Sequence, residues 1–189
     1  MTEIYMSTDV EADGPIPGRN SMLSFATAAF YNGKLVDTFE ANLELLPEAT
    51  PDPDTMKWWE TQQEAWDAHR KNLEKPLHAM PRYIEWVEAT SARYQAKPVF
   101  AAWPAGFDWT YVYWYLIAFV GKSPFSFSAI DIKSYAMGFM GRPYRQIGKR
   151  DLEEYRSLGR PHTHVALDDA LEQGEMFINM MAARSKIVL

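Results

Sequence analysis

Residues 4–18, IYMSTDVEADGPIPG, join a β-like run to a loop rich in proline and glycine. Because proline has no backbone N–H to donate, the strand predicted for residues 4–10 ends before this loop. Successive side chains of a strand point to opposite faces, so Asp9 and Glu11 project from the same face at the strand end. Two neighbouring carboxylates favour a bound cation, since each raises the pKa of the other. The plainer interpretation is that both extend into solvent.

Two more β-like runs follow this loop. Residues 22–31 and 35–45 are separated by Asn32-Gly33, a pair that readily adopts the positive φ angles of a tight hairpin turn. The first three strands are therefore expected to form an antiparallel meander.

The rest of the chain alternates between helical and β-like segments. The proline-rich segment 51–54 opens a helix with Asp54 or Thr55 as its N-cap. Helices are predicted over residues 54–70, 77–94, 108–120 and 166–184. Short strands are expected at 98–103 and 127–132, and helical or irregular structure at 135–140 and 151–158.

This order of elements predicts an α/β fold in one domain. Antiparallel strands followed by strand–helix alternation give a mixed sheet with helices packed on its faces. No repeat, low-complexity tract or linker divides the chain. A single domain is therefore expected over residues 1–189.

The composition excludes several classes of protein. The 189 residues are 47% hydrophobic, and 19 basic against 25 acidic residues give a net charge of −6. Such a chain can bury a core, but its surface as a whole repels a long polyanion. The absence of cysteine excludes disulfides, thiolate metal sites and a cysteine nucleophile.

Targeting and nucleotide-binding signals are also absent. The chain starts without a signal-peptide pattern, and the longest apolar run, near residues 111–120, is too short to cross a bilayer. A cytoplasmic protein without a membrane partner is expected. The sequence contains no G-x-G-x-x-G, G-x-x-x-x-G-K-[ST], H-E-x-x-H or G-x-S-x-G motif, which removes the main support for dehydrogenases, P-loop enzymes and serine hydrolases.

A third carboxylate lies where the strand at 98–103 meets the next helix. Asp108 is either a plain N-cap, a role that aspartate favours, or part of an acidic site. Phe107 and Trp109 flank it. Aromatic residues of this kind are usually core residues, although they can also stack on bases of a single strand.

The segment 162–169, HTHVALDD, supplies the last candidates. His164 and Asp169 are roughly 140° apart on a regular helix, so they converge only if His164 precedes the helix, as Pro161 suggests. Helical phase places Asp169 inward. It places Asp168 on a polar stripe with Glu172, Glu175 and Asn179.

A zinc site is the alternative for this segment. His162 and His164 form an H-x-H pair, but no other histidine stands at a matching spacing. His69 and His78 lie in predicted helices and are interpreted as surface or hydrogen-bonded residues.

The order of these motifs resembles the DEDDh family of 3′-to-5′ exonucleases, in the DnaQ-like group of the ribonuclease H-like superfamily. The shared features are Asp9-x-Glu11, Phe107-Asp108 and His164-x4-Asp169. The second motif departs from the family pattern because Trp103-Pro104-Ala105-Gly106 stands where an asparagine is common. The segment Thr55-x-x-Trp58-Trp59-x-x-Gln62 is also similar to small bacterial and phage exoribonucleases. The resemblance implies a mixed sheet, antiparallel in its first three strands and then parallel, with helices on both faces.

The resemblance also implies the site and its cofactors. Asp9, Glu11 and Asp169 would hold one divalent ion, Mg²⁺ or Mn²⁺, and Asp108 with Asp9 would help to hold a second. His164 would be the general base on the attacking water. The backbone N–H groups of Ala12 and Asp13 would contact the terminal nucleotide, and the candidates for stacking on its base are Phe107, Trp109 and Trp103. A homodimer is implied as the default.

The leading hypothesis is therefore a metal-dependent exonuclease that releases nucleoside 5′-monophosphates from a single-stranded 3′ end, RNA rather than DNA. The basic residues before the final motif either guide that strand or form an ordinary solvated loop; they are Lys133, Arg142, Arg145, Lys149, Arg150, Arg156 and Arg160. The alternatives are a DNA exonuclease or proofreading-type subunit, an inactive ribonuclease H-like interaction module, and an unrelated phosphohydrolase of small nucleotides.

Overall fold

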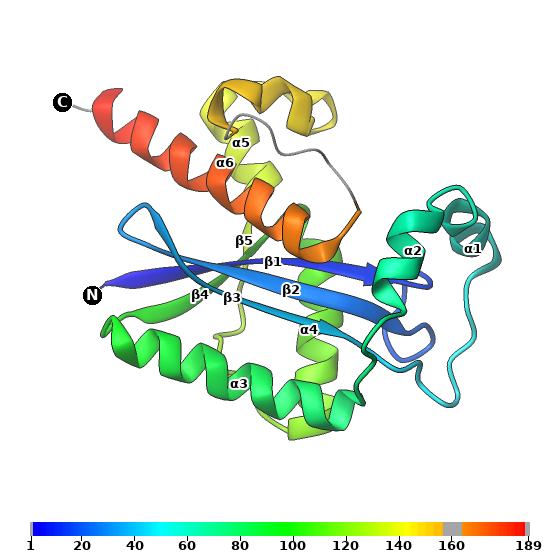
Figure 1. Ribbon diagram of the computed structural model, residues 1–189. Coiled ribbons are helices and arrows are strands. Elements are labelled where there is room, and N and C mark those ends of the chain that lie inside the picture. The colour runs from blue at the N-terminus through cyan, green and yellow to red at the C-terminus, as the bar shows by residue number, and fades with distance from the viewer. Residues whose placement is uncertain (1, 157–163, 188–189) are drawn as a thin grey trace.

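The computed structural model describes residues 2–156 and 164–187 and contains one five-stranded mixed sheet (Figure 1). The strands are β1 (Glu3–Ala12), β2 (Met22–Tyr31), β3 (Lys34–Asn42), β4 (Lys97–Ala102) and β5 (Ile130–Asp131), in the spatial order β3-β2-β1-β4-β5. The first three strands pair antiparallel, and β4 and β5 continue the sheet in parallel. The mixed sheet expected from the sequence is confirmed.

Helices cover both faces of this sheet (Figure 1). One face packs against α3 (Pro76–Arg93) and α4 (Ala105–Val120), and the other against α5 (Ile132–Met140) and α6 (Ala166–Ile187). Two short helices, α1 (Pro53–Trp59) and α2 (Gln63–His69), lie beyond the carboxyl end of β1, and the 3₁₀ segments η1 (Tyr144–Gln146) and η2 (Lys149–Tyr155) follow α5. None of the described helices is long and apolar enough to cross a membrane.

The helix predicted over residues 54–70 is in fact two helices. Its N-cap is Asp52, not Asp54 or Thr55, because Pro53 occupies the first helical position and the Asp52 carboxylate accepts the Thr55 N–H at 2.9 Å. The first helix ends in a turn in which the Thr61 N–H donates to the Trp58 carbonyl.

Several other boundaries also differ from the prediction. The α4 helix begins three residues before the predicted start, the strand predicted over residues 127–132 shortens to Ile130–Asp131, and β3 ends at Asn42. Residues 157 and 158 of the segment predicted over 151–158 lie outside the described residues.

The α6 helix lies unusually close to β1 and β2. The Ser7 hydroxyl donates to the Ala170 carbonyl at 2.8 Å, and the Gln173 amide donates to the Thr8 carbonyl at 2.8 Å. A methyl group at Gly174 would overlap the Phe30 ring and would lie 2.8 Å from the Ser7 Cβ. The absence of a side chain at Gly174 therefore allows the helix to reach the strands.

This close approach predicts that Gly174→Ala destabilises the protein. The added methyl group forces the helix away from the sheet, and such overpacking typically costs about 1–3 kcal/mol. Gly138→Ala on α5 is the matched control, because nothing lies within 4 Å of its added methyl group and alanine is favoured over glycine in a helix by about 1 kcal/mol. Urea denaturation of both variants measures the difference. Equal or opposite effects would contradict this account of the packing.

Candidate active site

Asp9 and Glu11 lie near the carboxyl end of strand β1, on the face of the sheet that packs against α6. Asp9 pairs with Ala26 of β2 and Glu11 with Ser24, and the ladder shifts register immediately after Glu11. Ser7, two residues earlier on the same face, contacts α6 directly. Both carboxylates are half-buried. They therefore point into the space between the sheet and the helix, and the alternative in which they extend freely into solvent is wrong.

Asp108 joins them from the first turn of α4. Its side chain is 3% exposed, and its Oδ1 accepts the Val10 N–H at 2.9 Å. The helix is capped at Pro104 without a side-chain hydrogen bond, so the N-cap interpretation of Asp108 is wrong. The carboxylate instead reaches across to the strand that carries Asp9.

His164 and Asp169 complete the group from the start of α6. His164 lies two residues before the helix, and single ligand atoms of Glu11, His164 and Asp169 lie within 4.8 Å of one another. The expected convergence of His164 and Asp169 from the loop is therefore observed. Asp169 is 2% exposed, as helical phase predicted, whereas Asp168 is half-buried.

The solvent stripe predicted with Asp168 is only partly correct. Glu172 is 3% exposed and pairs with Lys149 at 3.0 Å and with Arg156. The η2 segment, which carries Lys149, covers this face of α6. Glu172 of the predicted polar stripe is therefore buried in an ion pair and not exposed to solvent.

Burial, followed by repulsion between like charges, determines the electrostatics of the acidic group. Burial raises the pKa of Asp9 well above its usual range, and the neighbouring charges of Asp108, Glu11 and Asp169 raise it further. Burial likewise raises the pKa of Asp108 to about 7. Lys149 opposes both shifts. Among the described residues, four carboxylates opposed by Lys149 leave an excess of hard oxygen donors, which fits Mg²⁺ or Mn²⁺.

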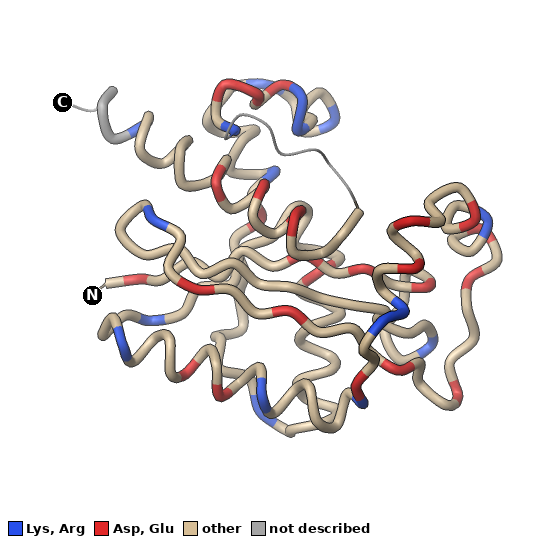
Figure 2. Tube along the Cα trace, viewed as in Figure 1, with Lys and Arg blue, Asp and Glu red and all other residues tan. Residues whose placement is uncertain are grey.

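Three of the seven basic residues before the final motif form ion pairs within the protein. Arg142 binds Asp151 at 2.8 Å, and Lys149 and Arg156 bind Glu172. Arg160 lies outside the described residues. Figure 2 shows Lys and Arg spread over both layers and not gathered on one face. Arg142, Lys149 and Arg156 therefore have a role in holding the protein's own segments together.

The predicted backbone contacts to the nucleotide are contradicted at Asp13. Its N–H donates to the Ser21 carbonyl at 3.0 Å, and its carboxylate accepts the Ser21 N–H at 2.6 Å. Asp13 is therefore part of the turn that follows β1. Ala12 is also buried, and its carbonyl accepts the Trp59 indole N–H at 3.0 Å.

The three candidate stacking residues have different surroundings. Trp109 is half-buried, and its ring packs against Phe100 at 5.0 Å and Phe125 at 6.0 Å. Phe107 is half-buried and packs on Tyr111. Trp103 is half-buried on the α5–α6 side of the sheet, which is also the side of Asp9.

Two aromatic residues near His164 were not assigned to the site from the sequence. The Trp58 ring meets the His164 ring edge to face, with centroids 4.9 Å apart, and is 39% exposed. His69 binds the His164 carbonyl at 2.7 Å. No spacing rule links these residues to His164, because the contact spans about a hundred residues. The His162 of the zinc alternative lies outside the described residues.

Comparisons with known proteins agree with this arrangement. Residues 5–181 match the family described as "3'-5' exoribonuclease Rv2179c-like domain". The chain is 32% identical over 191 residues to the "3'-5' DNA exonuclease Cap18" of Escherichia coli, covering 98% of this chain and 96% of that protein.

Solved structures share the fold. The nuclease domain of 3'hExo, a DEDDh family member bound to rAMP, superposes with a TM-score of 0.66 at 13% identity, over 96% of this chain and 93% of that one. A 3'-exonuclease described in 3'-end recognition of a histone mRNA stem-loop gives a TM-score of 0.70 at 14% identity, over 96% and 83%. The expected ribonuclease H-like exonuclease fold is confirmed.

The raised pKa of Asp108 predicts a pH-dependent stability in metal-free protein. Between roughly pH 4, the ordinary aspartate pKa, and about 7, the folded state binds a proton that the unfolded chain does not. The free energy of unfolding therefore falls as the pH rises through this interval. In EDTA, Asp108→Asn should reduce the fall in melting temperature between pH 5 and pH 8, because the amide keeps the acceptor for Val10 without a charge.

Burial lowers the pKa of His69, so this residue makes the free energy of unfolding rise with pH and opposes the effect of Asp108. The effect of Asp108→Asn is therefore measured as the difference between the pH dependence of its melting temperature and that of the wild type. Asp168→Asn is the control and should keep the wild-type slope. An unchanged slope in Asp108→Asn would contradict the assignment.

Proposed function

The chain belongs to the Rv2179c-like family of 3′-5′ exoribonuclease domains, and we propose that it releases nucleoside 5′-monophosphates one at a time from the 3′ end of single-stranded RNA. The observation that carries this proposal is the convergence of Glu11, His164 and Asp169 within 4.8 Å, next to the half-buried Asp9, whose charge interacts with that of the buried Asp108. Hydrolysis by a 3′-5′ exonuclease is the activity common to the family and to its E. coli relative.

The carboxylates would hold two divalent ions. Asp9, Glu11 and Asp169 would bind one, and Asp108 with Asp9 the second. Such ions, when bound, stabilise the attacking and leaving oxygens of a phosphoryl displacement.

His164 would take the proton of the attacking water. Its ring is half-buried, lies beside Glu11 and Asp169, and is supported at its edge by Trp58. An imidazole in this position can accept a proton at neutral pH and release it again. Trp58 and Trp103 each leave part of an aromatic side chain near the acids, and we propose them, with Phe107, as surfaces for the terminal bases.

A second candidate is a DNA 3′-5′ exonuclease. The name of the E. coli relative favours it, whereas the family description favours RNA. The complete set of four acids and one histidine argues against an inactive interaction module. A homodimer is proposed on the family resemblance alone, and the mass of the protein in solution would test it.

The central test uses a 5′-labelled single-stranded RNA, a matching DNA and free nucleotides in Mn²⁺. The RNA should shorten as a ladder from its 3′ end with release of mononucleotides, and it should shorten faster than the DNA. A blocked 3′ end should protect it. Cleavage of a circular RNA would contradict the exonuclease assignment, and faster degradation of the DNA would select the second candidate.

The adjacent aspartates give a matched pair of variants. Asp169→Asn should fall below about 1% of wild-type turnover, because it removes a proposed metal ligand, and it should lose most of the stabilisation that Mn²⁺ gives to the wild-type melting temperature. Asp168→Asn, one residue away and outside the acidic group, should keep most of the activity and the full Mn²⁺ effect. The reverse result would mean that the wrong aspartate has been assigned.

A further inference from the structure

His69 is a buried side chain with both ring nitrogens engaged. It is 2% exposed, its Nδ1 lies 2.8 Å from the Ser24 hydroxyl, and its Nε2 lies 2.7 Å from the His164 carbonyl oxygen. A carbonyl only accepts, so Nε2 carries the hydrogen and Nδ1 accepts from Ser24. The Ser24 hydroxyl on β2 therefore donates to Nδ1 and stabilises the tautomer in which His69 donates to His164.

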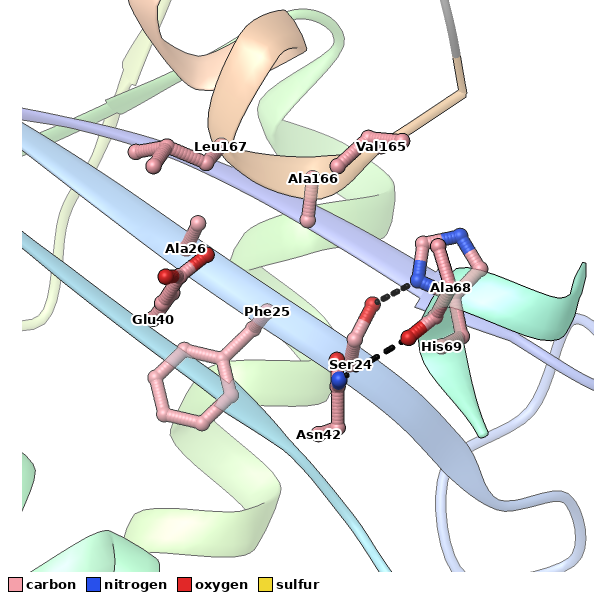
Figure 3. Close-up of a pocket in the computed structure, with 10 residues that line it drawn as sticks. All are labelled: Ser24, Phe25, Ala26, Glu40, Asn42, Ala68, His69, Val165, Ala166 and Leu167. Atoms are coloured by element: carbon pink, nitrogen blue, oxygen red, sulfur yellow. Dashed lines mark hydrogen bonds between the residues drawn. The ribbon is translucent and has the colours of Figure 1, made fainter. Parts of the chain in front are cut away.

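The backbone of His164 requires such support. Its φ angle is 54°, in the left-handed region that non-glycine residues rarely adopt. The following residues Val165, Ala166 and Leu167 line a pocket of about 160 Å³ that extends toward β2 and β3 (Figure 3). Packing on that side is therefore incomplete, and a hydrogen bond to the His164 carbonyl restrains the segment where side-chain contacts do not.

Residues of the α1 and α2 helices contact His164 and its surroundings. The Trp59 ring packs against the His69 ring with centroids 5.3 Å apart, and its indole N–H donates to the Ala12 carbonyl at 3.0 Å. Trp58 contacts the His164 ring itself. Since Ala12 directly follows Glu11, the same two helices contact both the strand end that carries the acids and the residue that carries the imidazole.

We propose that His69 is a positioning residue for His164: its N–H holds the His164 carbonyl, and so the strained backbone, in the conformation that turns the imidazole toward Glu11 and Asp169. The effect on catalysis rests on the proposed role of His164 as general base. The positioning itself does not, and the two are tested separately.

Two substitutions separate the donor from the bulk of the ring. His69→Phe keeps a buried aromatic ring without the N–H, and His69→Gln keeps an N–H donor. His69→Phe should lower kcat on the order of 100-fold, because small misplacements of a reacting group cost that much, with KM changed by less than about twofold. His69→Gln should restore most of kcat, and His78→Phe, at an exposed position of α3, should match wild type.

A double-mutant cycle excludes a general loss of structure. If His69 acts through His164, then His69→Phe should cost little further activity in a His164→Ala background. Equal losses in both backgrounds would overturn the proposal. Should His69→Phe fail to fold, Ser24→Ala serves in its place, because it removes the hydroxyl that donates to Nδ1 of His69 and stabilises this tautomer.

An NMR measurement tests the positioning without any activity. The chain has four histidines, and His164→Ala identifies the ring signal of His164, which the nearby Trp58 ring should shift away from its value in an unfolded chain. His69→Phe should move this signal toward the unfolded value, and His69→Gln should not. An unmoved signal in His69→Phe would overturn the proposal even if the wild type is an exonuclease. A moved signal in a protein without exonuclease activity would support the positioning and reject the proposed function.

Discussion

The close packing of α6 against β1 and β2 is the constraint on which the acidic site depends. Gly174 lets the helix backbone approach Phe30 and Ser7, and the Ser7 hydroxyl holds the Ala170 carbonyl. Asp169 precedes Ala170, so the same hydrogen bond sets its distance from the acids of β1. A helix farther from the sheet would leave Asp169 in solvent and Glu11 without its neighbour.

The fold must also tolerate the repulsion that this packing creates. Burial and like charges raise the pKa of Asp9, and burial raises that of Asp108. The structure offsets part of this cost through Lys149, which Glu172 holds beside the acids from α6. A backbone N–H from Val10 offsets another part at Asp108. A group of acids that destabilises the metal-free protein is consistent with a site selected for binding cations and not for stability.

Local patterns in the sequence predicted most of the sheet and the inward phase of Asp169. Hairpin residues, strand alternation and helical phase are patterns among residues close together in the sequence. The β1–β3 meander and the start of α6 depend on such patterns, so the sequence alone predicted them. The errors arise where distant segments meet. Asp108 binds a strand residue 98 positions away, and Glu172 is buried because η2 covers its face of α6. The contacts of Trp58 and His69 with His164 also join segments about a hundred residues apart, and no local pattern predicts them.

The position of Asp169 and α6 late in the chain has a consequence for biosynthesis. The acids on β1 and Asp108 are translated before the final helix, and Ser7 reaches its partner only across 163 residues of sequence. A nascent chain on the ribosome therefore lacks one acid of this group until α6 has left the exit tunnel, and it cannot form the Ser7–Ala170 hydrogen bond before then.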